Sequence, residues 1–296
     1  MKLTAPARPA PGAVPLSRVC GHLLRRSHQV HNALWGQGFG AELTSPQYAV
    51  LTALAARPGI DQAQLGDLVA LDKSSVADVV ARLAGRMWVS RARDPGDTRR
   101  NVLALTPAAA IALRHLVAAS DRVQQRILDP VPAGDRDRLL RGLRAVARSE
   151  SVPAGNDVPG HLIRRAQRVH TAYWAEVFDR ELTGPQYAAL HVLACWPDIN
   201  QRQLGDAAAL DKSTAADLID RLERRGWVVR QPDPADRRGK LLALSATAAT
   251  LVHDLAPRVA EVQAMLLSAL PPAEREGFLR ALALVAYAGA PPTVPG

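Results

Sequence analysis

The sequence has little cysteine and no long apolar run. Two of its 296 residues are cysteine, Cys20 and Cys195, which is too few for the disulfide framework of a secreted domain and fits a reducing compartment. No segment reaches the roughly 18 apolar residues that a membrane-spanning helix needs, and the nearest, residues 278–290, contains Arg280. Residues 1–15 are rich in Ala and Pro and lack the apolar core of a signal peptide. We therefore expect a soluble, cytoplasmic protein.

The sequence also lacks the residue patterns of an enzyme. It contains no nucleophile paired with a base, no glycine-rich phosphate loop and no paired metal ligands, so we expect neither catalysis nor a cofactor. The chain is instead strongly basic, with 37 Lys and Arg against 28 Asp and Glu and a formal net charge of +9. A polyanion is therefore a candidate partner.

The sequence repeats itself over the length of a whole domain. Residues 43–49 (LTSPQYA) return as residues 182–188 (LTGPQYA), and residues 64–67 (QLGD) return as residues 203–206. The offset between the copies is constant without a gap over residues 21–105, where about half of the aligned positions are identical. Such a repeat is much longer than a solenoid unit of roughly 20–50 residues, so it predicts two domains.

Composition places the boundaries of these domains. We expect a disordered Ala/Pro-rich tail at residues 1–15, a first domain at residues 16–149 and a second at residues 160–290. Residues 150–159 have the Pro, Gly and Ser content of a linker. Lys and Arg are divided unevenly, since residues 1–150 carry 21 against 12 Asp and Glu, whereas residues 151–296 carry 16 of each.

Each copy predicts the same order of elements, mainly helical with a small β-hairpin. Apolar residues at helical spacing predict a long first helix, and Val76, Val79 and Leu83 are expected to face the core from the fourth. Proline, capping boxes and acidic N-caps mark the helix starts. The expected elements of the first copy are a helix over residues 16–42, helices starting near Pro46, Asp61 and Asp72, strands at residues 88–91 and 102–105, and helices starting at Thr106 and after Pro132.

The order of these elements and motifs resembles the MarR family of bacterial regulators. The resemblance rests on LTSPQY (LTGPQY in the second copy), QLGD, LDKS, RLxxR and DPxDxR, which follow one another in this order in both copies. It implies a winged helix-turn-helix flanked by dimerisation helices, and family members are normally homodimers of subunits about the size of one copy. This chain therefore resembles a dimer fused head to tail, and we expect a monomeric pseudo-dimer. Thr98 departs from the pattern, because the second copy has Arg237 there.

The resemblance implies that a double-stranded DNA operator contacts two features of each copy, the second helix of the helix-turn-helix and the wing. In a helix-turn-helix the start of the second helix meets base edges in the major groove, although the Ser and Thr residues there are also suited to capping the helix. By resemblance, an Asp in the wing holds an Arg that enters the minor groove; exposed hairpins of this composition are otherwise common. The expected base and backbone contacts of the helices are Lys73, Ser74, Ser75, Val76, Arg82, Lys212, Ser213, Thr214, Ala215 and Arg221. Those of the wings are Arg91, Arg93, Asp97, Arg99, Arg100, Arg230, Asp236, Arg237, Arg238 and Lys240.

The first helix of each copy carries a candidate effector site. Imidazole, guanidinium and indole groups recur there one helical turn apart, a combination that suits an aromatic carboxylate or phenol. The alternative is that these residues are structural and pack at an interface. The residues are His22, Arg26, His31 and Trp35, repeated as His161, Arg165, His170 and Trp174. The resemblance predicts a repressor that such an effector releases from an imperfect inverted repeat.

Three alternatives remain at the level of sequence. The first is a constitutive architectural DNA-binding protein without an effector. The second is a redox-sensing repressor acting through Cys20, although Pro159 stands at the equivalent position and an inert thiol is favoured. The third is a metal sensor using His28 and His31, which is disfavoured because the second copy has Gln167 in place of the first of these.

Overall fold

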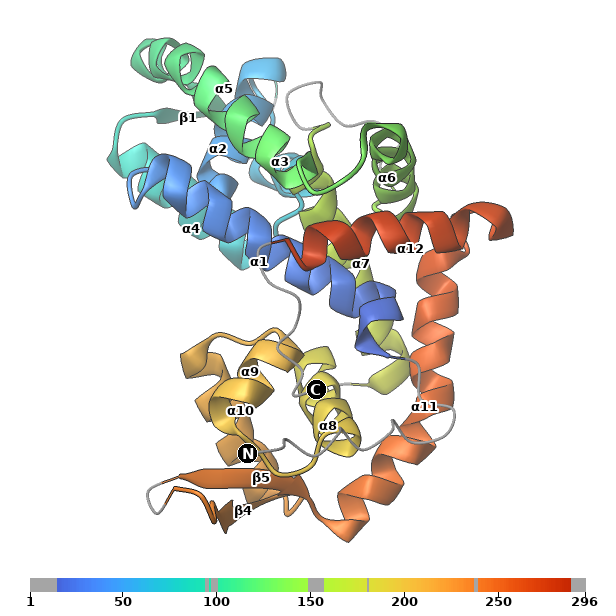
Figure 1. Cartoon of the computed structure of the whole chain (residues 1–296). Coiled ribbons are helices and arrows are strands. Elements are labelled where there is room, and N and C mark those ends of the chain that lie inside the picture. Colours follow the sequence, from blue (N-terminus) through green and yellow to red (C-terminus); the bar gives the residue numbers. More distant parts are fainter. Residues whose placement is uncertain are drawn as a thin grey trace. The chain divides into compact units, whose positions relative to one another are not determined.

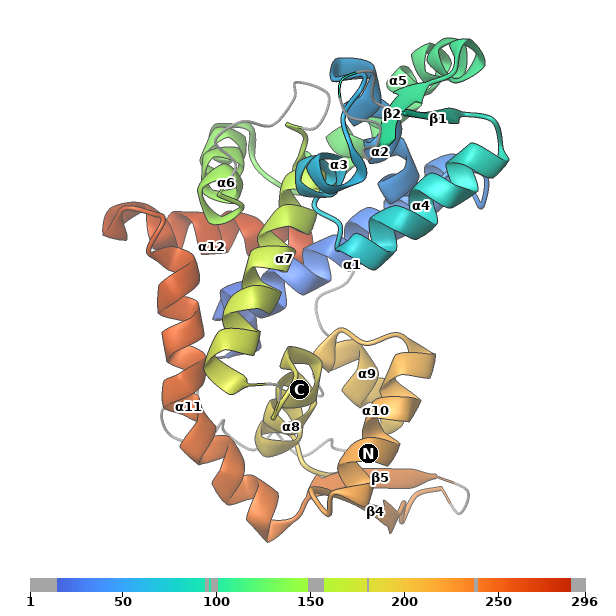
Figure 2. The same cartoon turned by 180° about the vertical axis from the view of Figure 1, so that it is seen from behind.

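The computed structural model describes residues 15–93, 96, 101–148, 157–179, 181–236 and 239–288. Most of the expected tail and linker lies outside these ranges. The described part is mainly helical with two small antiparallel sheets, which confirms the expected fold class (Figures 1 and 2). Within the described ranges, no helix combines the length and the apolar character needed to cross a membrane.

The elements of the two repeats correspond one to one, except that the first has an additional 3-10 turn, η1, and the second an additional short strand, β3. The first repeat forms η1 (Leu16–Arg18), α1 (Cys20–Phe39), α2 (Ser45–Ala56), α3 (Gln62–Val69), α4 (Lys73–Gly85), β1 (Val89–Arg93), β2 (Asn101–Leu105), α5 (Pro107–Leu128) and α6 (Ala133–Val146). The second forms α7 (Pro159–Phe178), α8 (Gly184–Cys195), β3 (Ile199–Asn200), α9 (Gln201–Ala208), α10 (Lys212–Arg224), β4 (Val228–Pro232), β5 (Lys240–Leu244), α11 (Ala246–Leu267) and α12 (Pro272–Ala286).

The helix starts follow the capping signals of the sequence. Thr44 and Asp61 each form a capping box at the start of α2 and α3, in which the side chain accepts from the third backbone N–H of the helix. Asp72 caps α4 and Thr106 caps α5 in the same way. The first helix is shorter than expected at both ends, because a 3-10 turn precedes it and Gly40, with φ +59°, ends it.

Each repeat builds its hairpin as an antiparallel pair. In the first, Val89 pairs with Leu105 and Arg93 with Asn101. In the second, β5 lies between β4 and the short β3. The first repeat has only a bridge between Ile60 and Leu103 where the second has β3.

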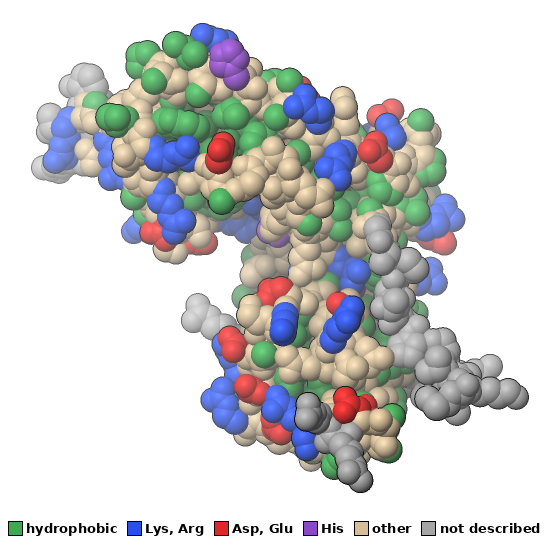
Figure 3. Space-filling view, turned by 60° about the vertical axis from the view of Figure 1, so that its left-hand side comes forward, with side chains coloured by type: hydrophobic (Ala, Val, Ile, Leu, Met, Phe, Trp, Pro, Cys, Tyr) green, Lys and Arg blue, Asp and Glu red, His purple; other side chains and the backbone are tan. Residues whose placement is uncertain are grey.

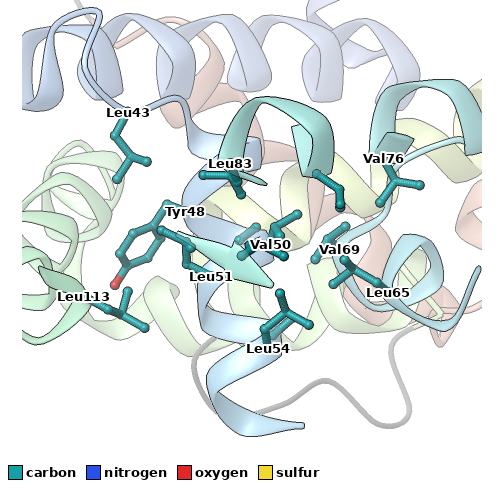
Figure 4. Close-up of a cluster of buried hydrophobic side chains, with 14 of the residues drawn as sticks. Leu43, Tyr48, Val50, Leu51, Leu54, Leu65, Val69, Val76, Leu83 and Leu113 are labelled. Carbon is teal, nitrogen blue, oxygen red and sulfur yellow. The ribbon is translucent and has the colours of Figure 1, made fainter. Parts of the chain in front are cut away.

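The core of the first winged helix lies among α2, α3, α4 and the hairpin (Figure 4). Leu51 and Leu54 of α2 and Leu65 of α3 are fully or almost fully buried in it. On α4 the residue fully buried beside Leu83 is Val80, whereas Val79 is only partly buried. Val76 and Leu83 are therefore buried as expected, and Val80 takes the place expected for Val79. This core fixes the angle at which α3 and α4 follow one another.

The described residues form two compact units that are not the two sequence repeats. One unit contains residues 27–168, and the other contains residues up to 26 together with those from 169 onward. The first half of α7 therefore belongs to the unit that contains α2–α5. Likewise, the first third of α1, residues 20–26, belongs to the unit that contains α8–α11. Each winged helix is completed by part of a helix from the other repeat.

Close approach at two glycines accompanies this exchange of helix segments. A Cβ atom on Gly160 would lie 2.5 Å from Nε2 of His31, and one on Gly21 would overlap the ring of His170. Real Cβ atoms do not come this close to a neighbour, so each imidazole packs directly on helix backbone. Glycine is needed at both positions because there is no space for a Cβ atom and not because of the backbone conformation, since neither residue has a positive φ.

Replacing Gly160 with alanine tests this contact. Gly160→Ala is expected to lower the free energy of unfolding by about 1–3 kcal/mol, the usual cost of overpacking a core. Gly36→Ala is the matched control, because Gly36 lies in α1 and a Cβ atom there would have no tertiary neighbour within 4 Å. It is expected to stabilise by about 0.5–1 kcal/mol through helix propensity alone. Urea unfolding measures both, and equal effects of the two substitutions would show that Gly160 has no close neighbour in solution.

Candidate nucleic-acid interface and effector cavity

One aspartate organises the start of each helix expected to enter the major groove. The Asp72 carboxylate accepts hydrogen bonds from the Ser75 backbone N–H at 2.9 Å, from Ser74 Oγ at 2.6 Å and from Ser75 Oγ at 2.7 Å. Asp211 makes the equivalent bonds at the start of α10. These bonds hold the pKa of both carboxyls well below its usual range. The hydroxyl groups thus take part in the cap, and each oxygen keeps capacity to accept a further hydrogen bond.

Two residues of the expected DNA surface are buried instead. Val76 and Ala215 are each 2% exposed. Figure 4 shows Val76 among the apolar side chains of the core. Both residues lie four positions after the N-cap aspartate, where the turn of the helix directs the side chain toward the rest of the domain. The expectation that their methyl groups contact thymine is therefore corrected.

The other described members of the expected DNA surface are accessible. α4 lies beside the β1–β2 hairpin and α10 beside the β4–β5 hairpin (Figures 1 and 2). The exposed or partly exposed residues are Lys73, Ser74, Ser75, Arg82, Arg91, Arg93, Lys212, Ser213, Thr214, Arg221, Arg230, Asp236 and Lys240. Asp97, Arg99, Arg100, Arg237 and Arg238 lie outside the described residues.

The eight expected effector residues divide between the two units. His31, Trp35, His161 and Arg165 belong to the unit of residues 27–168, and His22, Arg26, His170 and Trp174 belong to the other. Each set therefore takes two residues from each repeat. All of them are buried except the two arginines, which are partly exposed. The indoles have a structural role as well, since Trp35 donates to the Leu43 carbonyl at 2.7 Å and Trp174 to the Leu182 carbonyl at 2.6 Å.

The unit of residues 27–168 contains a cavity at this set. Its volume is about 10 Å³, which is room for about one water molecule, and it is partly open to solvent. It combines two aromatic rings with imidazole, hydroxyl and amide groups. The lining residues are His31, Trp35, Ser45, Tyr48, Ala49, Gln124, Val158, His161 and Arg164. Arg165 is not among them, so the arginine at the cavity is the neighbour of the one expected from the sequence.

Arg164 is a buried cation without a carboxylate partner in the described part of the chain. Its side chain donates from Nε to the Val69 carbonyl at 3.3 Å and from Nη1 to Ser45 Oγ at 3.1 Å, and Nη2 lies 2.9 Å from His161 Nδ1. The residue is 8% exposed. Burial and the charge of Arg165 lower the pKa of its guanidinium to about 10. A buried charge is costly unless it is paired, so an anion in the cavity is a natural complement.

The same guanidinium also holds the helix-turn-helix. The last carbonyls of α3 have no partner within the helix, and three arginines of α7 donate to this region. These bonds are Arg164 to Val69 at 3.3 Å, Arg165 to Asp67 at 2.7 Å and Arg168 to Leu71 at 2.7 Å. In the other unit Arg25 donates to the Ala208 carbonyl at 2.5 Å and Arg26 to the Asp206 carbonyl at 2.8 Å. The turn before each recognition helix is thus anchored by arginines of the other repeat.

The corresponding region of the other unit has different side chains. Gly184 and His191 occupy the positions of Ser45 and Thr52. His191 is buried, with Nδ1 3.4 Å from Tyr187 Oη and Nε2 3.6 Å from Cys195 Sγ. Arg25 therefore has no hydroxyl at the position where Arg164 meets Ser45. The alignment of the repeats contains both differences, but the sequence analysis did not connect them with the cavity.

Burial keeps the imidazoles of the cavity neutral. It lowers the pKa of His31 to about 3 and that of His161 to about 2, and the charge of Arg164 adds to both shifts. Neither ring nitrogen of His31 has a hydrogen-bond partner among the described residues. The cavity thus offers a neutral, unpartnered imidazole close to a cation.

The structure also bears on the cysteine and metal alternatives. Cys20 is fully buried, and burial raises the pKa of its thiol to about 12, which removes the thiolate that a peroxide sensor requires. Burial raises the pKa of Cys195 as well. His28 and His31 have ring centroids 6.4 Å apart. Across the described ranges, no three His, Cys, Asp or Glu side chains gather as metal ligands.

The neutral histidines predict a loss of stability in acid. An unfolded histidine binds a proton near pH 6.5, whereas folded His31 does so only near pH 3. The unfolded state therefore takes up protons first, and the stabilisation present above pH 6.5 is lost as the pH falls toward 3. At pH 5 the loss is about 2 kcal/mol for this residue. Urea unfolding of the parent and of His31→Gln at pH 7 and pH 5 measures it, and parallel pH dependences would contradict it.

Comparisons with known proteins agree with this architecture. The MarR family model matches residues 43–101 and 182–240. The transcriptional regulator HosA of Escherichia coli O111:H- is 32% identical over 123 residues, which are 42% of this chain and 90% of HosA. The transcriptional repressor NicR of Pseudomonas putida is 32% identical over 131 residues, 44% of this chain and 83% of NicR. The crystal structure of the PcaV transcriptional regulator from Streptomyces coelicolor with its natural ligand is 41% identical, covering 47% of this chain and 99% of that one, with a TM-score of 0.44. This chain therefore belongs to the MarR family and contains two of its domains in tandem.

Proposed function

We propose that the protein is a DNA-binding transcription repressor that a small aromatic carboxylic acid or phenol releases from its operator. It acts as a single-chain pseudo-dimer on an imperfect inverted repeat. The observation that carries the proposal is the position of Arg164, which lines the cavity and also donates to the end of α3. One buried cation therefore connects this small cavity, which must widen to admit an aromatic ring, to the helix-turn-helix.

The DNA-binding part rests on two accessible recognition helices with adjacent hairpins. Lys73 and Arg82 of α4 are exposed, as are Lys212 and Arg221 of α10. Basic side chains on these elements suit phosphate contacts, while the start of each helix meets base edges. That the homologous NicR is named a transcriptional repressor supports repression as the outcome.

The effector part rests on the composition of the cavity. Trp35 and Tyr48 line the cavity with aromatic side chains, which suit a ring, and Ser45 and His31 add polar groups. A carboxylate beside Arg164 would form a charge-assisted pair in a buried setting, where such pairs are strong. A constitutive architectural protein would need the bond from Arg164 to α3 but not the cavity beside it.

Release follows from competition for the same guanidinium. A carboxylate that recruits Arg164 weakens its bonds to the Val69 carbonyl and to Ser45, and so loosens the end of α3. Because α3 and α4 pack on one another, a shift of α3 changes the presentation of Lys73 and its neighbours. The ligand thus favours a state in which the recognition helix no longer fits its groove.

The pseudo-dimer part rests on the exchange of helix segments. Each winged helix takes the start of the first helix from the other repeat, so one chain supplies both partners. HosA is matched over 90% of its length by 42% of this chain, so this chain is long enough to hold two domains of that size. No second chain is then needed to complete either unit.

Substitution of Arg164 tests the effector mechanism. With DNA selected from a random pool by the parent protein, a panel of monocyclic aromatic carboxylates and phenols is screened for release by fluorescence anisotropy. Arg164→Gln is expected to raise the concentration needed for release about 10- to 100-fold, the value of a lost hydrogen bond to a charged group. Arg165→Gln is the matched control, because that side chain also donates to α3 but does not line the cavity.

A second variant guards against misfolding of the first. Ser45→Gly introduces the residue that the other repeat has at this position and removes one polar group from the cavity. It is expected to weaken the response while leaving DNA binding intact. If no compound of the panel releases the DNA, the effector proposal is wrong. If Arg164→Gln and Arg165→Gln respond alike, the site lies elsewhere.

The proposed assembly makes a separate prediction about mass. Light scattering of the DNA-free protein should give about 31.7 kDa, the mass of one chain, over a wide range of concentration. The physical reason is that both units are completed within the chain. A main species of twice this mass would overturn the single-chain pseudo-dimer, while leaving the DNA-binding proposal intact.

A further inference from the structure

An ion-pair cluster occupies the base of the second wing. Arg230 of β4 places Nη2 2.5 Å from Asp220 Oδ1 and Nη1 3.4 Å from Glu223 Oε2, both on α10. The three side chains are between 34% and 56% exposed, so the cluster lies at the surface. Arg230 was expected from sequence to contact DNA phosphates, and here it is paired twice within its own repeat.

The first repeat has the arginine but not the acids. Arg91 is the equivalent of Arg230, and the positions of Asp220 and Glu223 are occupied by Ala81 and Ala84. Arg91 is exposed and has no ion-pair partner among the described residues. Over whole recognition helices, α4 has two basic residues and one acidic residue, whereas α10 has three of each. Part of the charge difference between the repeats therefore lies at this face.

The surrounding surface shows the same mixture of charge. In Figure 3, acidic and basic side chains lie next to one another over the part formed by α8–α10 and β4–β5. The sequence total agrees, since residues 151–296 carry 16 basic and 16 acidic side chains, whereas residues 1–150 carry 21 and 12. A phosphate approaching Arg230 meets two carboxylates at the same place.

We propose that Asp220 and Glu223 mask Arg230, so that the two halves of the chain bind DNA with unequal electrostatic strength. The first repeat anchors the chain through phosphate contacts, and the second contributes less nonspecific affinity and depends more on base contacts. The inference rests on the proposed DNA-binding function. Its physical basis is that a guanidinium held by two carboxylates releases no DNA counterion when phosphate approaches, whereas a free guanidinium does.

The masking predicts a particular pattern of coupling between substitutions. Binding of the full chain to a random-sequence DNA duplex is measured by anisotropy as a function of salt. In the parent, Arg230→Ala is expected to change affinity little. In the background Asp220→Ala with Glu223→Ala, the same substitution is expected to flatten the log–log salt dependence by about 0.9, the value of one phosphate contact. That slope corresponds to about a threefold change in affinity between 50 and 200 mM salt.

The double-mutant cycle separates masking from simple removal of negative charge. If the carboxylates act only as repulsive charges, removing them raises affinity by the same factor whether or not Arg230 is present. Equal effects of Arg230→Ala in the two backgrounds therefore overturn the proposal. All three positions are at least one-third exposed, so the variants are expected to fold, and circular dichroism checks this.

The first repeat provides the reciprocal control. Ala81→Asp with Ala84→Glu copies the acidic pair onto α4 and is expected to flatten the salt dependence by a similar amount. Arg91→Ala should weaken binding in the parent but have little effect in that background. If the parent itself fails to bind the duplex at low salt, the proposed function fails. A parent that binds while both cycles are additive contradicts only the masking.

Discussion

The architecture depends on hydrogen bonds from arginine side chains to the carbonyl groups at the end of α3 and α9. A helix leaves its last carbonyls without partners, and a buried carbonyl without a partner is costly. Here the turn passes through Ala70 or Ala209 in the left-handed region, with φ 54° at both, so the chain leaves the helix abruptly. Arginines of the other repeat supply the missing donors. The helix-turn-helix and the exchange of helix segments are therefore parts of one arrangement.

This arrangement explains why the cavity and the helix-turn-helix share residues. Arg164 is held on one side by Ser45 and His161, which line the cavity, and on the other by the Val69 carbonyl. A side chain with five donors in a rigid fork is suited to such a divided role, which lysine would not perform. The position of Ser45 is taken by Gly184 in the other unit, so the repeats have diverged at the cavity as well as at the wing.

The sequence was sufficient for features that depend on neighbouring residues. The capping box at Asp61 and the N-cap at Asp72 were predicted because their partners lie within four positions. The choice of Arg164 rather than Arg165 was missed, since both are one helical turn from His161 and only tertiary packing decides which is buried. The pairing of Arg230 with Asp220 was also missed, because it requires a strand to lie beside a helix.

Domain boundaries show the same limit. Similarity between the copies defines a repeat, whereas contacts define a compact unit. The boundaries of the compact units fall inside α1 and α7 and not between the repeats. No local pattern distinguishes a helix that packs on its own repeat from one that packs on the other. Gly21 and Gly160 leave space for an imidazole, but in each case that imidazole belongs to the other copy.

The exchange of helix segments also imposes an order on synthesis of the chain. Because the chain is synthesised from its N-terminus, the unit of residues 27–168 is complete once Arg168, in the middle of α7, has left the ribosome. The other unit joins Arg26 to the Ala286 carbonyl, 260 positions later. Its N-terminal segment must therefore remain unpaired until translation is almost complete. Such non-local contacts are slow to form and leave apolar surface exposed meanwhile. This exposed apolar surface includes Leu23 and Leu24, which are fully buried in the completed fold.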